Sequence, residues 1–247
     1  MEFPDRLIEP ARRLNSVLRG AKSLLETHYL LFPEMESIYR SLFLRDLGRY
    51  GVEDEFYPIG SAANHSLMYL VARCLIEFPI ARVLEFGAGQ TSILLDRLSG
   101  AMGRPIEITT VEQDPFWAER IRAQVHHPVI CAPLAPEVVA DSKISFYRLD
   151  EIGSQSNLEL VIVDGPTAYS PSTRWDRIGA VEFLKGRLAS EFIVIFDDTE
   201  RAGEFLGTRL FCDYLVANHI THYISTIRAA KQQKVICSEQ FRAASYF

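Results

Sequence analysis

Acidic residues follow four short apolar runs in this 247-residue chain. Glu85 follows "RVL", Glu112 ends "IEITTVE", Asp164 ends "LELVIVD", and Asp197 and Asp198 follow "EFIVIF". Carboxylates can accept hydrogen bonds from hydroxyl groups, hold a cation, or take a proton from a reacting group. Because ligands of open parallel sheets bind beyond the carboxyl ends of the strands, these acids predict a shared site at one sheet edge.

A glycine turn follows the first of these acids. The stretch "RVLEFGAGQTSILL", residues 82–95, contains Gly87 and Gly89, whose permissive backbone suits a tight turn and close ligand approach. A dinucleotide-binding turn reads G-x-G-x-x-G, and here Ser92 stands where the third glycine belongs. No Gly-Lys-Ser/Thr follows, which excludes a Walker loop. An ordinary strand-to-helix turn remains the alternative interpretation.

The charge of Glu85 predicts which nucleoside this turn holds. A carboxylate just before the turn would repel a diphosphate by on the order of a few kcal/mol in a partly desolvated site. The same carboxylate would favour S-adenosylmethionine, which carries an ammonium and a sulfonium and no phosphate. Glu112 can accept both hydroxyls of a ribose, a role that NAD and S-adenosylmethionine sites share, or can serve as a charge at the start of the following helix.

The stretches "VLEFGAGQTS" and "VEQD" resemble motif I and the following acidic motif of the class I S-adenosylmethionine-dependent methyltransferases, over roughly residues 60–240. Thr91 stands where many members have glycine, and a hydroxyl at a helix start is compatible because it can cap the helix. The resemblance implies that Glu112 holds the ribose and that Leu134 lies near adenine, although many members have an acid there. The cofactor-binding residues that we expect are Glu85, Gly87, Gly89, Thr91, Glu112, Leu134 and Asp164.

Three of the acids form a candidate cation site. Asp164, Asp197 and Asp198 end neighbouring strands of the expected sheet, about 4.8 Å apart, so their carboxylates can converge around a positive charge. Oxygen-only ligation suits Mg²⁺ or another hard divalent cation, which would lower the pKa of a substrate hydroxyl. The other source of positive charge is the cofactor's ammonium together with the arginines Arg174, Arg177 and Arg201.

This acid pattern resembles that of metal-dependent O-methyltransferases, of both the catechol and the macrolide-sugar types. "VDGP", an arginine loop and "FDDTER" are similar to a group associated with polysaccharide and natural-product sugars, including plant glucuronoxylan methyltransferases. In the alternative interpretation Asp164 touches the cofactor, while Asp198 or Thr199 caps the last long helix.

The candidate catalytic residues are Asp164, Asp198 and His65. His65 is either a base or a plain helix-start histidine. In residues 167–177 an aromatic and basic set can stack on a sugar ring and pair with a carboxylate, unless its tryptophan packs inward. The members of this set are Tyr169, Arg174 and Trp175.

The elements that must position these residues alternate between strands and helices. This alternation predicts an α/β, Rossmann-like, doubly wound and mostly parallel seven-stranded sheet. The expected strands are residues 81–86, 106–112, 128–132, 158–164 and 191–198, with a closing hairpin, 222–227 and 234–239, that adds one antiparallel strand. The expected helices between them are residues 64–77, 91–98, 115–125, 177–188 and 200–219.

We expect residues 1–58 to form an N-terminal helical segment, a lid or dimer surface, and residues 59–247 to form the methyltransferase domain. The segment should hold one helix around residues 14–25 and another from Glu34 to about Leu47. If this segment is a dimer surface, the protein is a homodimer.

Bulk composition fits a cytoplasmic protein. The chain has a net charge of −6, no basic block, no apolar run of membrane-spanning length, and four scattered cysteines without a CxxC pair. These features predict a small-molecule or carbohydrate substrate and neither a nucleic-acid nor a membrane partner.

We therefore expect an S-adenosylmethionine-dependent O-methyltransferase that acts, with or without a metal, on a hydroxyl of a sugar-containing or small polyol substrate. The alternatives are an S-adenosylmethionine-binding protein without turnover and an NAD-type oxidoreductase. The acids at four strand ends disfavour the first alternative, and the charge of Glu85 disfavours the second.

Overall fold

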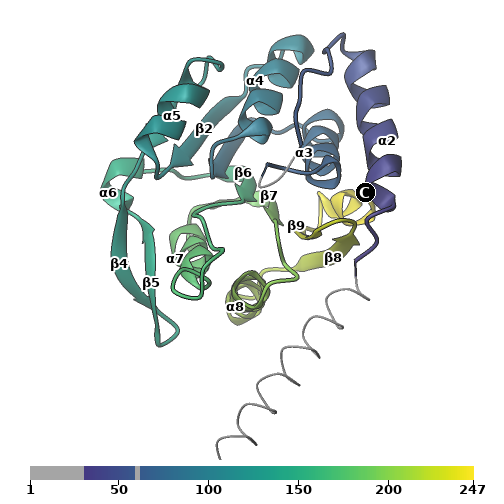
Figure 1. The fold of residues 1–247 in the computed structure, drawn as a ribbon. Coiled ribbons are helices and arrows are strands. Elements are labelled where there is room, and N and C mark those ends of the chain that lie inside the picture. The colour runs from purple at the N-terminus through teal and green to yellow at the C-terminus, as the bar shows by residue number, and fades with distance from the viewer. Residues whose placement is uncertain (1–30, 59–61) are drawn as a thin grey trace, which may run out of the picture.

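A seven-stranded sheet in the order β3-β2-β1-β6-β7-β9-β8 forms the centre of the protein (Figure 1). The structure is a computed structural model and describes residues 31–58 and 62–247. The strands are β1 (Arg82–Phe86), β2 (Glu107–Glu112), β3 (Val129–Cys131), β6 (Leu158–Val163), β7 (Leu188–Phe196), β8 (His222–Arg228) and β9 (Gln232–Ser238). Only β9 runs antiparallel to its neighbours in this sheet, which confirms the predicted topology with one antiparallel strand.

The strand order reverses at β1. The chain moves outward through β2 and β3, and then returns to the other side of β1 with β6. Ligands of doubly wound sheets bind at such a switch point, beyond the carboxyl ends of the strands. The glycine turn follows β1, while Glu112 is the last residue of one neighbouring strand, β2, and Asp164 follows the other, β6, so all three lie around this switch point.

Helices cover both faces of the sheet (Figure 1). One face packs against α2 (Met35–Arg49), α3 (His65–Glu77), α4 (Gln90–Met102) and α5 (Pro115–Arg122), and the other against α7 (Gly179–Leu184) and α8 (Ala202–Ala217). Alternate strand residues serve the two faces: in β1, Val83 belongs to the first core and Leu84 to the second. No helix in the described part of the chain is both long and apolar enough to cross a bilayer.

The N-terminal segment contributes to the first core. The helix predicted from Glu34 to about Leu47 is α2, and its Phe43 and Leu47 are buried against the core that also contains α3. The helix expected around residues 14–25 lies outside the described residues. The boundary between residues 1–58 and 59–247, and a role of this segment as lid or dimer surface, stay predictions.

A second, two-stranded sheet was not expected. Where the sequence suggested a mixed segment, β4 (Leu134–Val139) and β5 (Ser142–Tyr147) pair as an antiparallel hairpin, followed by the short helix α6 (Leu149–Ile152). The connecting residues Ala140 and Asp141 have φ of 48° and 62°. Two-residue hairpin turns of this kind usually carry Asn-Gly or Asp-Gly, so the sequence lacks the usual turn signal.

The packing at the start of α7 predicts that alanine substitutions at Gly179 and Gly100 have opposite effects on stability. A Cβ at Gly179 would lie 2.2 Å from Cγ of the buried Phe146, so Gly179→Ala should lower the free energy of unfolding by about 1–3 kcal/mol. A Cβ at Gly100 in α4 would meet no atom within 4 Å, so Gly100→Ala should raise it by about 0.5–1 kcal/mol. Chemical denaturation measures both, and a wild-type stability for Gly179→Ala would contradict this packing.

Candidate active site

A cavity of about 640 Å³ opens at the switch point of the sheet. The glycine turn, the ends of β2 and β6, the start of α5 and the segment before α3 line this cavity. Among the cofactor-binding residues predicted from the sequence, those that line it are Gly87, Gly89, Thr91, Glu112 and Asp164, and the predicted Tyr169 and Arg177 line it too. The predicted sheet edge therefore carries a concave site of the size that small-molecule ligands need.

Two predicted cofactor-binding residues, Glu85 and Leu134, and the candidate base His65 lie outside this cavity. Glu85 is fully buried beneath the glycine turn. Leu134 starts the β4–β5 hairpin and packs against the second core, and His65 starts α3, where its ring lies edge-on to Phe43. The expectation that these side chains face the ligand or the reacting group is corrected accordingly.

Glu85 holds the turn from below. Its Oε2 accepts hydrogen bonds from Ser92 Oγ at 2.5 Å and from Thr110 Oγ1 at 2.7 Å, while Oε1 has no hydrogen-bond partner. Burial raises the pKa of Glu85 to about 7, although hydrogen bonds from these hydroxyls and from Thr91 oppose that shift. A carboxyl in this position cannot select a ligand by direct charge, so the electrostatic argument built on Glu85 is wrong.

The backbone of the turn, rather than Glu85, bears on which ligand this turn can hold. The N–H groups of Gly87, Ala88 and Gly89 are all engaged by acceptors within the protein. Those acceptors are Val111 O at 2.9 Å, Glu112 Oε2 at 3.0 Å and Ser92 Oγ at 2.9 Å. In dinucleotide folds the N–H groups of this region bind the diphosphate. The turn here leaves those three donors unavailable to a phosphate group.

Two details fix the shape of the turn. Gly87 has φ of 93°, and a Cβ there would lie 3.0 Å from the Asp164 backbone, so glycine is required where β1 and β6 approach. Ser92 Oγ, which accepts from the Gly89 N–H, caps the start of α4. The capping hydroxyl is therefore that of Ser92, whereas Thr91 had been considered for this role.

Glu112 presents a carboxylate to the cavity in one orientation. Its Oε1 accepts from the N–H groups of Gln113 at 2.8 Å and Asp114 at 2.9 Å, and its Oε2 accepts from that of Ala88. Burial raises the pKa of Glu112, and these backbone N–H groups act in the opposite direction. Each oxygen keeps further acceptor capacity, which suits a pair of ribose hydroxyls.

An aromatic wall at the start of α5 was missed in the sequence. Phe116, Trp117 and Arg120 line the cavity, and Trp117 Nε1 donates to Ala88 O at 2.6 Å. The Arg120 guanidinium lies 5.6 Å from the centre of the Trp117 ring. The available signal was "DPFW" directly after the second acidic strand end, because a helix that starts there must begin at the ligand edge.

Tyr147, at the end of β5, takes the place in the cavity lining that was expected of Leu134. The two residues are partners in the hairpin, and Tyr147 lines the cavity while Leu134 does not. The Tyr147 ring stacks on Phe86 with centres 5.6 Å apart, and its buried Oη has no hydrogen-bond partner in the described structure. Burial raises the pKa of this phenol, so it stays a neutral donor that is left for a ligand.

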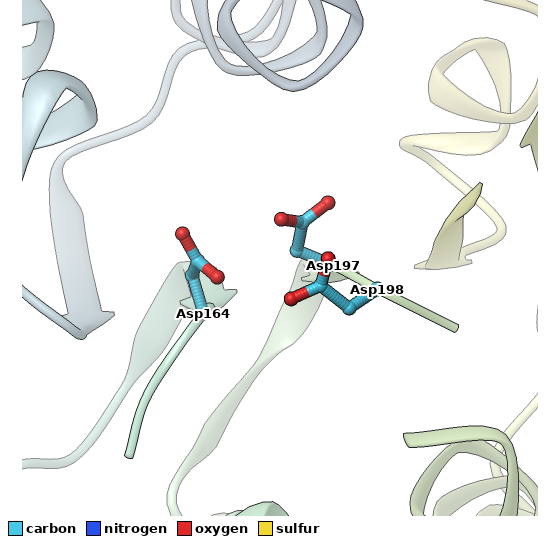
Figure 2. A group of neighbouring side chains, drawn as sticks. All are labelled: Asp164, Asp197 and Asp198. Atoms are coloured by element: carbon cyan, nitrogen blue, oxygen red, sulfur yellow. The ribbon is translucent and has the colours of Figure 1, made fainter. Parts of the chain in front are cut away.

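The three aspartates converge as predicted (Figure 2). Asp164, Asp197 and Asp198 offer carboxylate oxygens that all lie within 4.8 Å of one another. Cationic side chains of the protein lie among them. The ion pairs run from Arg177 to Asp164 (3.2 Å) and Asp198 (3.0 Å), from Arg201 to Asp198 (3.0 Å), and from Lys231 to Asp197 (3.1 Å) and Asp198 (3.3 Å). Lys231 was not foreseen, and Arg174 is not among these pairs.

The negative charge of the aspartate cluster is compensated by cationic side chains of the protein. Three carboxylates meet three cationic side chains, and a fourth acid, Glu204, has its pKa raised to about 7 by burial. A divalent ion bound to all three aspartates would have to displace Lys231 and Arg177 from their carboxylates. The residues as arranged therefore do not fit a divalent cation, although their oxygen-only chemistry would suit one.

Asp164 alone among the three aspartates reaches the cavity. Its side chain is 16% exposed, whereas those of Asp197 and Asp198 are at most 1% exposed and do not line the cavity. Burial and the nearby Asp197 carboxylate raise the pKa of Asp164. Burial also raises the pKa of Asp197, but Lys231 and Gln233 outweigh this effect and hold it below its usual range. Asp198 is therefore an ion-pair partner and no longer a candidate catalytic group.

The remaining loop residues divide between cavity and core. Tyr169 lines the cavity under the Arg201 guanidinium, 5.0 Å from its ring centre. Trp175 packs against the second core, with Arg174 on its face, as the alternative interpretation held. Neither Asp198 nor Thr199 caps α8, because the helix starts after Arg201 and Thr199 Oγ1 donates to Gln232 O.

Comparisons with known proteins concern the fold. No protein-family model matches this chain, and no curated protein does. An O-methyltransferase from Bacillus cereus, solved with SAH, is 13% identical with a TM-score of 0.49, over 82% of this chain and 91% of that one. The O-methyltransferase TomG from Streptomyces achromogenes, solved with SAM, is 15% identical with a TM-score of 0.43, over 88% and 96%.

A methyltransferase from Pyrococcus furiosus is 12% identical with a TM-score of 0.45, over 82% of this chain and 98% of that one. These similarities are low, so the function of this chain is inferred from its own residues.

The buried Glu85 predicts a pH dependence of stability. Its pKa is about 7 in the fold and near 4.3 when unfolded, so between these values the folded state binds more protons and stability falls as pH rises. Glu85→Gln removes this contribution, so its free energy of unfolding relative to wild type should rise by about 2–3 kcal/mol from pH 4.5 to 8. Urea denaturation across this range measures it, with the exposed Glu119→Gln as control. A difference that stays constant with pH would contradict the buried placement.

Proposed function

We propose that this chain is an S-adenosylmethionine-dependent methyltransferase that acts on a hydroxyl of a sugar-containing or small polyol substrate. The observation that carries the proposal is the glycine turn, whose three N–H groups are engaged within the protein beside a fixed carboxylate at the end of β2. Such a site suits a nucleoside that has a ribose and no phosphate. The three engaged N–H groups disfavour a diphosphate at Gly87, Ala88 and Gly89, and the oxidoreductase alternative with it.

The lining residues fit the parts of S-adenosylmethionine. Glu112 is suited to the ribose hydroxyls, Trp117 and Phe116 to the adenine face, and the unpartnered Tyr147 Oη to an adenosine acceptor atom. Asp164 lies on the other side of the glycine turn from Glu112 and offers negative charge to the onium end. The cofactor supplies a methyl group already activated on its sulfonium.

Asp164 is the proposed proton acceptor. It reaches the cavity, and Arg177 Nη2 lies 3.2 Å from its Oδ1, which fixes the orientation of the carboxyl group. A pKa raised by burial makes this carboxylate a stronger base for a hydroxyl proton than an ordinary aspartate. The protein otherwise has to align the acceptor oxygen and exclude water.

Aromatic side chains at the cavity favour a sugar-like acceptor. Tyr57 and Tyr169 line it and remain largely exposed, so the Tyr57 ring and the face of Tyr169 that Arg201 does not cover are free to stack on a sugar. We propose that the reaction is metal-independent, because Arg177 and Lys231 already neutralise the aspartates that would hold an ion.

The ligand assignment predicts a binding pattern. S-adenosylhomocysteine should bind and NAD should not, as measured by isothermal titration calorimetry. Glu112→Gln should weaken S-adenosylhomocysteine binding about 10- to 100-fold, because a charged acceptor for ribose is lost, and Tyr147→Phe about 2- to 10-fold. Glu119→Gln, on the outer surface of α5, is the matched control and should bind like wild type. Binding of NAD that Glu112→Gln abolishes would contradict the proposal.

The assignment of Asp164 predicts a pH–rate profile. The rate of S-adenosylhomocysteine formation, screened with methyl glycosides and polyols as acceptors, should fall as pH drops through a pKa above the usual aspartate range. Asp164→Asn should lower kcat by about 10²- to 10⁴-fold and remove this limb. Asp176→Asn, which changes a buried acid in the 3₁₀ helix after the loop that follows Asp164 and outside the cavity, is the control. An Asp164→Asn variant with the wild-type rate would exclude Asp164 as the base.

A further inference from the structure

We infer that Lys231 is a built-in counter-ion that takes the place of a divalent cation in the aspartate cluster, and that removing its ammonium group opens a divalent-cation site there. The inference concerns cation binding at Asp197 and Asp198 and holds whether or not the chain transfers a methyl group. Its test uses no acceptor substrate, so its failure and that of the proposed function are distinguishable.

The first step is the position of the ammonium group. Lys231 Nζ lies 3.1 Å from Asp197 Oδ2 and 3.3 Å from Asp198 Oδ1, so one nitrogen bridges two consecutive carboxylates at the end of β7. These are two of the three carboxylates whose oxygens converge in Figure 2. A hard divalent ion that used this oxygen set would need the same space.

The second step is the way the backbone holds Lys231. It lies in the turn between β8 and β9, directly before Gln232, which is anchored on both sides. Gln232 N donates to Glu200 Oε2 at 2.9 Å, and Gln232 O accepts from Thr199 N at 2.8 Å. These bonds tie the hairpin to the segment that carries the two aspartates, so the ammonium group is placed by both elements.

The third step is the charge that would remain without Lys231. Asp197 and Asp198 are almost fully buried, and removing one partner of a buried ion pair leaves an uncompensated charge. Gln233 Nε2 would still donate to Asp197 Oδ1 at 2.7 Å, and Arg177 and Arg201 would still pair with Asp198 Oδ2. Asp197 Oδ2 and Asp198 Oδ1, the latter already without a hydrogen bond, would both be left open.

The truncated lysine would leave these two oxygens and the volume of its side chain. Water can complete the coordination of a hard cation bound to two carboxylates, so Mn²⁺, Mg²⁺ or Ca²⁺ can restore the balance. In the native chain the Lys231 ammonium group excludes such an ion, because it repels a cation and already fills the position between the two carboxylates.

The experiment compares wild type, Lys231→Ala and Lys234→Ala by thermal unfolding and by calorimetric titration with MnCl₂, MgCl₂ and CaCl₂. Wild type should show no saturable heat and no shift of Tm. Lys231→Ala should have a lower Tm in EDTA and should regain several degrees as Mn²⁺ is added, with saturation. Lys234→Ala is the matched control: this lysine of β9 lies over Phe205 and has no ion-pair partner among the described residues, so it should not respond.

Two further variants show whether the aspartate cluster itself binds the ion. Lys231→Ala combined with Asp197→Asn should lose the response to Mn²⁺, because a site carboxylate has been removed. Lys231→Met keeps the apolar stem, and it should respond to Mn²⁺ if the alanine variant does not fold in EDTA.

The inference is overturned by any of three outcomes. The first is saturable Mn²⁺ binding by wild type that Asp197→Asn abolishes, which would show that the native chain holds the metal. The second is a Lys231 variant that folds but ignores divalent cations. The third is the failure of both Lys231 variants to fold with or without Mn²⁺.

Discussion

Three carboxylates buried at one sheet edge can coexist only because three cationic side chains lie among them, and the architecture of the site follows from this compensation. Arg177 brings the loop after β6 to the end of β7, and Lys231 brings in the β8–β9 turn. Asp164 is thereby the one aspartate of the cluster at the cavity, which Arg177 also lines, whereas Lys231 and Arg201 do not line it.

Two carboxylates, those of Glu85 and Glu112, hold the glycine turn in place. Beneath the turn, Glu85 accepts a hydrogen bond from the Ser92 hydroxyl, which itself accepts one from the Gly89 N–H. Beside the turn, Glu112 accepts a hydrogen bond from the Ala88 N–H. Both acids therefore shape the turn, but only Glu112 also faces the cavity. Glu112 thus both supports the turn and faces the cavity, whereas Glu85 only supports the turn.

Much of the fold could be predicted because strands and helices alternate with clear boundaries, and because acids mark the strand ends. The convergence of three aspartates followed from strand adjacency alone. The orientation of Glu85 was accessible but overlooked: it shares the β1 face of Val83, which packs against α4, and therefore points toward Ser92. Lys231 was not predictable, because no local pattern shows which carboxylate a turn residue more than 30 positions away will meet.

The lining of the cavity depends on the register of the β4–β5 hairpin, because Tyr147 of β5 is one of its lining residues. Tyr147 reaches the cavity from a two-stranded sheet that lies beside α7, outside the main sheet (Figure 1). Side chains of a strand alternate between its two faces, so losing one residue within β5 would turn the phenol away while leaving every strand of the main sheet in place. Insertions and deletions in this hairpin can therefore change the width and polarity of the cavity without any change in the main sheet, at whose edge Asp164 lies.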